Sequence, residues 1–279
     1  MGERIARLRG ALSDAPLAAL ALFTLLLICA IFGPWIAPYD PLATDAAIAL
    51  RPPSAAHWFG ADQLGRDVLS RVIVATRLDF AIAFSAVILS GVVGSVIGAA
   101  IGYFRGFADA AVSRVVDVLM AFPLFVLAMA TVAALGNSVT SVIAATAVVN
   151  LPFYIRLARA ETTIRRDLGY MEAARVGGSS PARILRVFLL PNILPPLVVQ
   201  ASLNLGWAML NAAGLSFIGL GVRAPTPEWG IMVADGAQFI SSGQWWTALF
   251  PGLALMLAVF CFNSLGDGLR DALDPRSRR

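Results

Sequence analysis

The chain has 279 residues, of which 58% are hydrophobic and 14% are charged. Soluble domains carry about 25% charged residues, so this composition excludes an ordinary water-soluble domain and predicts a polytopic membrane protein. All 21 basic residues are arginine, and a standard phosphate-binding loop is excluded because it needs a lysine. The net charge of +4 is no indication of nucleic-acid binding, because membrane topology determines where the arginines lie.

Six segments are apolar and long enough to cross a bilayer, which takes about 20 residues. They are Leu17–Ala37, Phe80–Tyr103, Val115–Leu135, Val139–Leu157, Ile193–Leu220 and Thr247–Leu265. The first segment follows three arginines, but it is longer than the apolar region of a signal peptide, so we interpret it as a retained anchor. The predicted fold class is an all-α polytopic membrane protein with six transmembrane helices.

The arginines are distributed asymmetrically between the two sides of the membrane. With the N-terminus inside, the cytoplasmic segments hold 16 arginines and the outer segments hold five: Arg51, Arg66, Arg71, Arg77 and Arg223. Because positively charged loops stay in the cytoplasm, both termini are predicted to be cytoplasmic. Five of the six tryptophans fall near the predicted outer boundary, where amphipathic rings are favoured.

The spans divide the chain into five parts. These are a cytoplasmic segment 1–16, an anchor helix 17–37, an outer loop 38–77, a five-helix core 78–265 and a cytoplasmic tail 266–279. In the outer loop, the apolar residues between Val68 and Ile73 have helical spacing, which predicts an amphipathic helix on the outer membrane surface. In the core, the segment 158–191 is expected in the cytoplasm, because the seven arginines from Arg156 to Arg186 would cost about 20 kcal/mol in lipid.

The loop 158–191 contains stop and start signals for short helices. Asp167 can cap a helix that ends near Val176, and Gly177 and Gly178 can stop it, since glycine readily adopts the left-handed conformation that closes helices. Ser179 or Ser180 can cap the next helix, with Pro181 in its first turn. Pro191 is expected to end that helix just before the fifth span.

Glu172, Ala173 and Ala174 lie within the first of these short helices. The two alanines are small enough for a partner surface to approach the helix backbone, and Glu172 offers an anchor for a positive or amide group. The alternative is a solvated connector in which the alanines only favour helix.

The spacing of Glu172-Ala173-Ala174, then Gly178, then Leu190-Pro191, resembles the loop by which permease subunits of ATP-binding-cassette (ABC) importers contact separate ATPase subunits. Phe188 stands where an aliphatic residue is common in that family. Three further stretches resemble permeases of the dipeptide, oligopeptide and nickel class, although Trp58 replaces a more usual proline. They are His57–Arg71, Ala224–Gly230 and Leu265–Arg276. The resemblance covers nearly the whole chain and is closest to the second, shorter permease of such systems.

The resemblance implies a type I ABC importer permease fold with a cytoplasmic coupling helix, in the bacterial inner membrane. It implies a heterodimer with a homologous permease, two ATPase subunits that bind ATP and Mg, an extracytoplasmic substrate-binding protein, and no cofactor in this chain. Di- or oligopeptides are the expected cargo; nickel, glutathione or another small solute are alternatives. The residues that it assigns to ATPase coupling are Glu172, Ala173, Ala174, Gly177, Gly178, Leu190 and Pro191.

Several polar or small residues within or near the spans have two interpretations. Amide side chains there can form interhelical hydrogen bonds or line a translocation pathway; they are Asn150, Asn204, Asn211 and Asn263. Glycines spaced by four in the second span can permit close helix packing or leave room for a solute; they are Gly94, Gly98 and Gly102.

No metal site is predicted. His57 is the only histidine, and one histidine cannot build a multi-ligand site; it is expected in a solvated outer loop. Cys29 and Cys261 fall in apolar segments, where thiols behave as small hydrophobic groups.

Two other classes of function fit the sequence less well. A secondary transporter usually needs ionisable residues near the membrane midplane, whereas only Asp117 approaches a span interior. An intramembrane enzyme would need a catalytic motif, and neither H-E-x-x-H nor G-x-S-x-G occurs.

Overall fold

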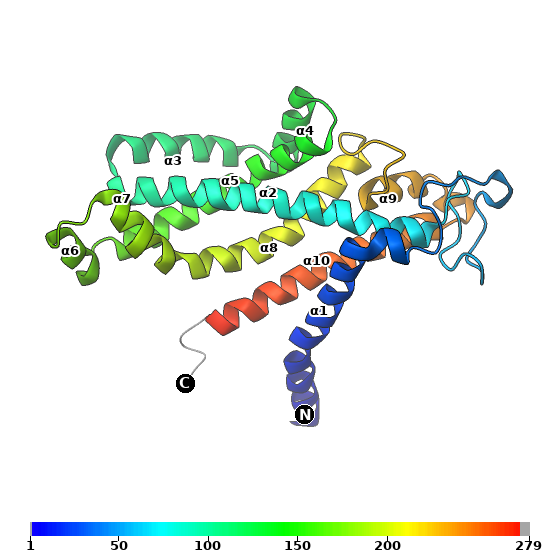
Figure 1. Cartoon of the computed structure of the whole chain (residues 1–279), viewed down its shortest axis with the longest axis horizontal. Helices are drawn as coiled ribbons and strands as arrows, with labels where there is room; N and C mark the ends of the chain where they lie inside the picture. The colour runs from blue at the N-terminus through cyan, green and yellow to red at the C-terminus, as the bar shows by residue number, and fades with distance from the viewer. Residues whose placement is uncertain (1, 274–279) are drawn as a thin grey trace.

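The computed structural model of the chain describes the backbone of residues 2–273 and the side chains of residues 17–271. The regular elements of this part are helices, most of which run along the longest axis of the molecule (Figure 1). The long helices are α1 (Gly2–Ile36), α2 (Val68–Phe104), α5 (Val139–Arg165), α8 (Leu190–Phe217) and α10 (Trp246–Leu273). The shorter ones are η1 (Ala46–Ile48), α3 (Gly106–Ala121), α4 (Leu124–Leu135), α6 (Gly169–Val176), α7 (Pro181–Arg183), η2 (Ile184–Leu189), α9 (Trp229–Ala237) and η3 (Ile240–Ser242).

Five helical stretches of the described residues are long and apolar enough to cross a membrane, and the pair α3 and α4 makes a sixth if it is counted as one span. The expected third span, Val115–Leu135, is therefore not one straight helix, because α3 and α4 meet at an angle of 98°. Pro123 explains the break. A proline disfavours the helical backbone conformation at the residue before it, and Phe122 is extended, with ψ of 145°.

Helices α2 and α5 pack closely through the glycines of the second span. A Cβ atom added to Gly98 would lie 2.4 Å from the carbonyl oxygen of Ile155, and one added to Gly102 would lie 2.8 Å from that of Arg159. Gly94 faces the same helix, with a Cβ atom added there 3.1 Å from the Leu151 carbonyl oxygen. The packing interpretation of these glycines is confirmed, because such distances require bare backbone on α2.

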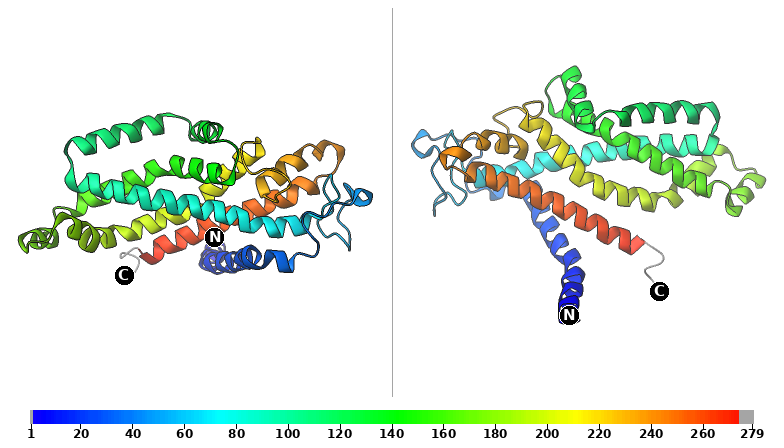
Figure 2. Two further views of the ribbon diagram at one scale, coloured as in Figure 1. Left: turned by 45° about the horizontal axis from the view of Figure 1, so that its top comes forward. Right: turned by 180° about the vertical axis from the view of Figure 1, so that it is seen from behind.

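Helix α1 lies on the outside of the bundle, against α2 and α10. Phe23 packs edge-on against Phe262 with ring centroids 5.9 Å apart, and the buried Cys261 thiol donates a hydrogen bond to the Ala19 carbonyl at 3.2 Å. Cys261 thus packs as a small apolar residue, as expected. Toward its N-terminus α1 leaves the other helices (Figure 2).

Two expected boundaries are wrong. The segment from Val68 to Ile73 is not a separate helix on the membrane surface but the first turns of α2, with Val68 and Val72 buried in the core. Pro191 does not end a helix; the chain is helical from Pro181 to Phe217. The segment η2 is a π-helix in which the Leu190 N–H donates to the Leu185 carbonyl.

The prolines of α8 give a physical reason for this wider segment. A proline cannot donate a hydrogen bond, and its ring crowds the carbonyl four residues earlier. A wider π turn just before Pro191 relieves that crowding. Nearby, the Asn192 side chain adds a donor of its own, since its Nδ2 donates to the Phe188 carbonyl at 2.6 Å.

The structure describes part of each end of the chain. The backbone of the expected N-terminal segment is helical from Gly2, and α10 continues into the expected tail as far as Leu273. Met1 and residues 274–279 lie outside the described residues.

The α2–α5 contact can be tested by adding one methyl group. Gly98→Ala should lower the free energy of unfolding in detergent by about 1–3 kcal/mol, because a Cβ atom 2.4 Å from a backbone oxygen forces the helices apart. The matched control is Gly91→Ala, whose Cβ atom would make an ordinary 3.5 Å contact with Tyr154. Equal free energies of unfolding for the two variants would contradict this account of the packing.

Candidate functional site

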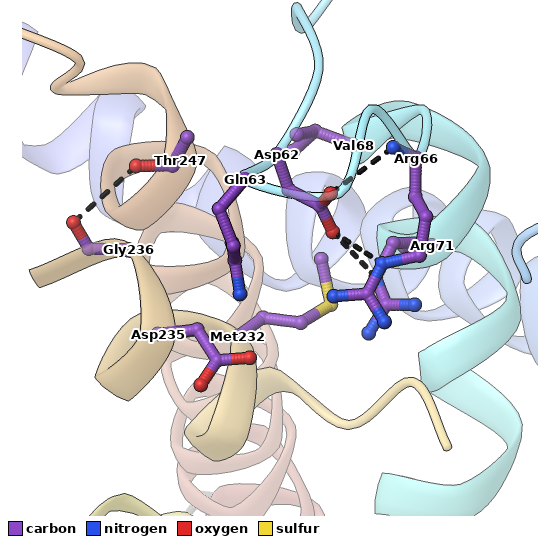
Figure 3. A pocket seen from close by; sticks show the side chains of 9 residues that line it. All are labelled: Asp62, Gln63, Arg66, Val68, Arg71, Met232, Asp235, Gly236 and Thr247. Carbon is purple, nitrogen blue, oxygen red and sulfur yellow. Dashed lines mark hydrogen bonds and ion pairs between the residues drawn. The ribbon is translucent and has the colours of Figure 1, made fainter. Parts of the chain in front are cut away.

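A cluster of buried charged side chains joins the outer loop to the bundle (Figure 3). The Asp62 carboxylate accepts a hydrogen bond from Arg66 Nε at 2.6 Å and one from the Leu64 N–H at 2.8 Å, and it lies 3.6 Å from Arg71 Nε. Both arginines are almost fully buried. Since a buried charge is costly unless it is paired, Asp62 is the counter-ion that holds both arginines inside the protein.

Arg71 links three separate segments at this end. Its Nη1 donates to the Pro41 carbonyl at 3.0 Å and to the Pro225 carbonyl at 3.4 Å. The outer loop, the start of α2 and the connection between α8 and α9 therefore meet at one side chain. The space beside it, edged by Gln63 and Asp235, measures ≈ 10 Å³ (Figure 3), which is room for about one water molecule. This cluster is a structural joint, too small to hold a solute.

Two more outer residues differ from expectation. His57 is only 17% exposed, and its Nδ1 lies 2.9 Å from Asp67 Oδ1, so the solvated position expected for it is wrong. Trp229 is fully buried, not at a lipid boundary, and its backbone N–H donates to Asp79 on α2 at 3.3 Å.

Glu228 fixes the start of α9 beside Trp229. Its carboxylate accepts from the N–H groups of Gly230 at 2.9 Å and Ile231 at 2.8 Å. Burial raises the pKa of the Glu228 carboxyl above its usual value, since a low-dielectric surrounding disfavours the charged form.

A cavity of ≈ 460 Å³ opens between α5, α8 and α10, next to α4. The structure brings all four asparagines named from the sequence into its wall. The lining residues are Leu124, Val149, Asn150, Phe153, Gln200, Leu203, Asn204, Trp207, Asn211 and Asn263. Every one of these side chains is uncharged, so the wall offers amides, aromatic rings and aliphatic side chains.

Half of the lining residues come from one face of α8. The lining positions from Gln200 to Asn211 fall at i, i+3, i+4, i+7 and i+11, which is the spacing of a single helical stripe. A stripe of amides facing hydrocarbon would be costly, and here the stripe lies in a cavity wall. Trp207 within it is 57% exposed.

Two of the amides do not tie the helices together, so the interhelical interpretation is wrong for Asn150 and Asn211. Asn150 Nδ2 donates to the Thr146 carbonyl at 2.9 Å, and Asn211 Nδ2 donates to the Trp207 carbonyl at 3.0 Å, so each bond stays within one helix. Asn204 accepts from Gln200 within α8. The Asn204 side chain also forms a hydrogen bond with the Tyr154 hydroxyl of α5, which supports the interhelical interpretation for this residue.

Charged residues reappear one turn further along α5. Arg156 pairs with Asp117 of α3 at 2.6 Å, and Arg159 pairs with Asp109 at 2.5 Å. A second cavity of ≈ 430 Å³ lies beside these pairs. The pairs attach α3 to α5 at the end of the bundle that leads to α6.

The loop at that end presents a short exposed helix. In α6, Glu172 and Ala173 are exposed, while Ala174 and Met171 are buried. Gly178 has φ of +75° and closes the helix in the left-handed region, as predicted, with Gly177 at the helix end. The loop lies at the opposite end of the molecule from the outer cluster (Figure 1).

The caps of this loop match the expectation in part. Ser180 caps the next helix through the Arg183 N–H, with Pro181 in the first turn. Asp167 does not cap α6, because the capping position is Leu168, which makes no side-chain capping bond. Asp167 instead lies 3.7 Å from Arg105, at the end of α2.

Arg175 anchors α6 to the long helices. Its Nη2 donates to the Arg166 carbonyl at 2.7 Å, and its guanidinium lies 5.6 Å from the centre of the Tyr103 ring. Such a cation–π contact, together with the hydrogen bond, fixes α6 to both α5 and α2. No local sequence pattern predicts this contact, since Tyr103 and Arg175 are 72 positions apart.

The structure separates the seven residues assigned to coupling. Glu172, Ala173, Gly177 and Gly178 share the exposed tip, whereas Leu190 and Pro191 line an apolar groove between α2, α5 and α8. Val176, which was not named from the sequence, is 86% exposed at the tip. A large apolar side chain at that exposure, next to two glycines, is the signal that could have identified it.

Within residues 17–271, no group of three or more histidine, cysteine or acidic side chains is arranged to hold a metal ion.

The helical bundle, the amide-lined cavity and the exposed loop helix define a membrane permease. Residues 91–279 match the family described as binding-protein-dependent transport system inner membrane component, and residues 15–53 match the N-terminal TM domain of oligopeptide transport permease C. The chain belongs to the first of these families. It is a permease subunit of an ABC importer, an inner-membrane protein that crosses the membrane several times, and not an enzyme.

Three curated relatives show how broad this similarity is. The probable D,D-dipeptide transport system permease protein DdpC of Escherichia coli (strain K12) is 45% identical over 92% of this chain and 86% of the relative. The dipeptide transport system permease protein DppC of Alkalihalophilus pseudofirmus is 42% identical over 93% and 85%. The glutathione transport system permease protein GsiD of Escherichia coli O6:K15:H31 is 43% identical over 92% and 85%.

A solved structure shares the fold. A chain of the MetNI methionine ABC transporter in an inward-facing conformation superposes with a TM-score of 0.56 over 71% of this chain and 93% of that chain. The two are 22% identical in sequence, so the comparison supports the type I importer permease fold alone.

Arg71 provides a test of the outer joint. Arg71→Met should lower the free energy of unfolding by about 3 kcal/mol, because Asp62 loses a buried partner and two carbonyl groups lose their donor. Arg77→Met, on an exposed position of the same helix, is the control and should change stability little. Chemical unfolding in detergent measures both; equal losses for the two variants would show that Arg71 is not a joint.

Proposed function

We propose that this chain forms one half of the pathway of a peptide importer and receives motion from ATPase subunits through α6. The second half of the pathway would come from a homologous permease. Two ATPase subunits would bind ATP and Mg, and an extracytoplasmic binding protein would deliver the peptide. Both termini and α6 would face the cytoplasm, in keeping with the arginine distribution.

The uncharged, amide-lined wall is the observation that carries the proposal of a peptide cargo. Peptides differ in their side chains but share a backbone of amide groups, and a wall of Asn and Gln residues can exchange hydrogen bonds with that backbone. The wall has no ionisable side chain that could carry protons or sodium for a secondary transporter. Two of the relatives are named as dipeptide permeases.

The exposed tip of the loop supports the proposal of coupling. Glu172 and Ala173 are exposed beside Val176, so an apolar and an acidic group lie next to a small residue. Leu168 and Tyr170, at the start of the same segment, are exposed as well, and a group of exposed apolar side chains marks a contact surface. Gly177 and Gly178 keep the end of α6 free of side chains, which allows another protein to approach the backbone closely.

The contacts of α6 provide a route from this surface to the cavity. Arg175 ties α6 to the ends of α2 and α5, and α5 carries Asn150 and Phe153 in the cavity wall. A displacement of α6 therefore moves a wall of the pathway. For ATP to drive the motion, the ATPases must bind α6 with different geometry before and after hydrolysis.

Glutathione is a second candidate cargo, because a relative with 43% identity is named as a glutathione permease. Glutathione is itself a small peptide with amide groups, so the same wall would serve it. Competition experiments in the reconstituted importer separate the two: unlabelled dipeptide and unlabelled glutathione are each added against labelled dipeptide.

Gly178 tests the coupling proposal. Gly178→Val should lower ATP-driven uptake of radiolabelled Ala-Ala about tenfold in proteoliposomes holding the full importer, while ATP hydrolysis continues, because valine is strained at the left-handed conformation of Gly178. Gly169→Val is the matched control. It lies in the same loop with open space around it and without a positive φ, so uptake should persist.

A cross-link would locate the contact. Ala173→Cys should form a disulfide or bismaleimide adduct with an ATPase subunit that carries a cysteine in its facing groove, whereas a cysteine at the outer residue Trp58 should not. Failure of Ala173→Cys to react from the cytoplasmic side would contradict the proposed orientation of α6.

A further inference from the structure

Two carboxyl groups are buried against each other where α2, α8 and α9 meet. Asp79 of α2 is 5% exposed, and Glu228, which directly precedes α9, is 0% exposed. Their side chains are hydrogen-bonded to each other, and Asp79 Oδ2 also accepts the Trp229 N–H at 3.3 Å. The pair therefore joins α2 to the start of α9.

A hydrogen bond between two carboxyl groups requires one proton. Ionised carboxylates are acceptors only, so two of them would face each other without a donor, and two buried like charges repel each other. No basic side chain of residues 17–271 forms a salt bridge with Asp79 or Glu228. The pair consequently holds one proton and carries one negative charge.

The surrounding donors indicate which carboxyl group keeps the charge. Glu228 accepts from two N–H groups in the first turn of α9 and from the Ser216 hydroxyl of α8. These donors and the positive end of the α9 dipole favour a carboxylate at this position. Asp79 accepts the Trp229 N–H at one oxygen, so its other oxygen can carry the proton and donate it to Glu228.

Other charged side chains near the start of α9 are held elsewhere. Arg71 of α2 lies against Asp62 and bonds two backbone carbonyls, and Asp235 of α9 acts on Arg71. Arg77 and Arg223 are exposed. Helix α8 faces the pair with one hydroxyl group. The pair thus has no counter-ion among the described residues, and the shared proton allows both carboxyl groups to stay buried together.

Helix α9 fits tightly between α8 and α10. A Cβ atom added to Gly230 would lie 2.3 Å from the Ala213 carbonyl oxygen of α8, and one added to Gly236 would lie 2.6 Å from the Thr247 carbonyl oxygen of α10. Both neighbouring helices also carry amides of the cavity wall. A displacement of α9 therefore disturbs two of the helices that form this wall.

We propose that Asp79 and Glu228 form a proton-dependent latch that holds α9 against α2, and that loss of the shared proton at alkaline pH releases α9 from the bundle. Two carboxylates would then separate into water, since neither has a cation to pair with inside. The latch lies at the end of the molecule opposite α6 (Figure 1). It makes the packing of α8 and α10 depend on the pH at that end, whatever solute the permease carries.

The direction of the pH effect follows from the protons bound in each state. In the unfolded chain both carboxyl groups are ionised above about pH 4, whereas the folded pair retains one proton, in keeping with the burial that raises the pKa of Glu228. This contribution to stability is fully present below about pH 4 and is lost as the pH rises. The unfolding equilibrium constant should increase about tenfold per pH unit until the folded pair ionises.

The first experiment measures reversible unfolding of the full-length chain in detergent from about pH 5 to about pH 9. Asp79→Asn keeps a donor toward Glu228 but has no proton to lose. The ratio of unfolding constants, wild type over Asp79→Asn, should therefore rise about tenfold per pH unit and level off once the pair ionises. The matched control is Asp235→Asn, which removes another carboxyl group of α9 and should keep the wild-type pH dependence. A wild-type to Asp79→Asn ratio that does not change with pH would overturn the latch.

Difference infrared spectroscopy detects the shared proton directly. At neutral pH the wild-type chain should show the C=O stretch of a protonated carboxylic acid, and this band should be missing from Asp79→Asn. Its absence from the wild type would refute the proposal. If Asp79→Asn does not fold, Glu228→Gln decides, because its amide can donate to an ionised Asp79 and it should remove both the band and the pH dependence.

A thiol in α9 reports the release itself. Met232→Cys places a thiol at a position that is 6% exposed. At alkaline pH this thiol should react with a methanethiosulfonate reagent several times faster in the otherwise wild-type chain than in the chain that also carries Asp79→Asn. Because both are compared at the same pH, ionisation of the thiol cancels, and the parent chain gives the background from Cys29 and Cys261. Equal rates at every pH would show that α9 stays docked and would overturn the release.

Discussion

The close contact between α2 and α5 is the constraint on which the other features depend. Glycines on α2 let two backbones touch over about two helical turns between Gly94 and Gly102, so the two helices move as one body. That body runs from Arg71, which joins three segments, to Tyr103, which meets Arg175 of α6. One wall of the cavity belongs to the same body, because α5 carries Asn150.

Charged side chains lie toward the two ends of this body. The cluster around Asp62 and the pairs Asp117–Arg156 and Asp109–Arg159 are each held by ion pairs between acidic and basic side chains. Between them the cavity wall consists of amides, aromatic rings and aliphatic side chains, and no charged side chain lines that cavity.

Much of the fold follows from local sequence signals. The six apolar stretches, the glycine spacing of α2 and the serine–proline start of α7 all depend on neighbouring residues, and the structure has each of them. The bend at Pro123 and the π-helix before Pro191 were missed, because a proline within an apolar stretch can end a helix, kink it or be absorbed by a wider turn, and packing decides between these outcomes.

For the candidate site too, the residue types could be predicted from the sequence, whereas the contacts that depend on packing could not. The four asparagines could be named from the sequence because polar residues in spans are rare, but the sequence could not show that they face one cavity. That fact depends on how α5, α8 and α10 are rotated. The buried position of Trp229 and the partly buried position of His57 were misjudged for a related reason. A polar or amphipathic residue near a membrane boundary is normally exposed, and here contacts with Asp79 and Asp67 accompany the burial.

The π-helical segment η2 has a geometric consequence for how α6 and the cavity are matched. The backbone is helical without a break from Pro181 through η2 to the amide stripe, so the rotation of that stripe about its axis is tied to the orientation of the loop. In an α-helix one residue corresponds to about 100° of rotation, and a π turn takes up more residues than an α turn. The length of Ile184–Leu189 thereby sets which face of α8 looks into the cavity. Its six residues of wider winding determine the angle, about the helix axis, between the α6 loop and the amide stripe.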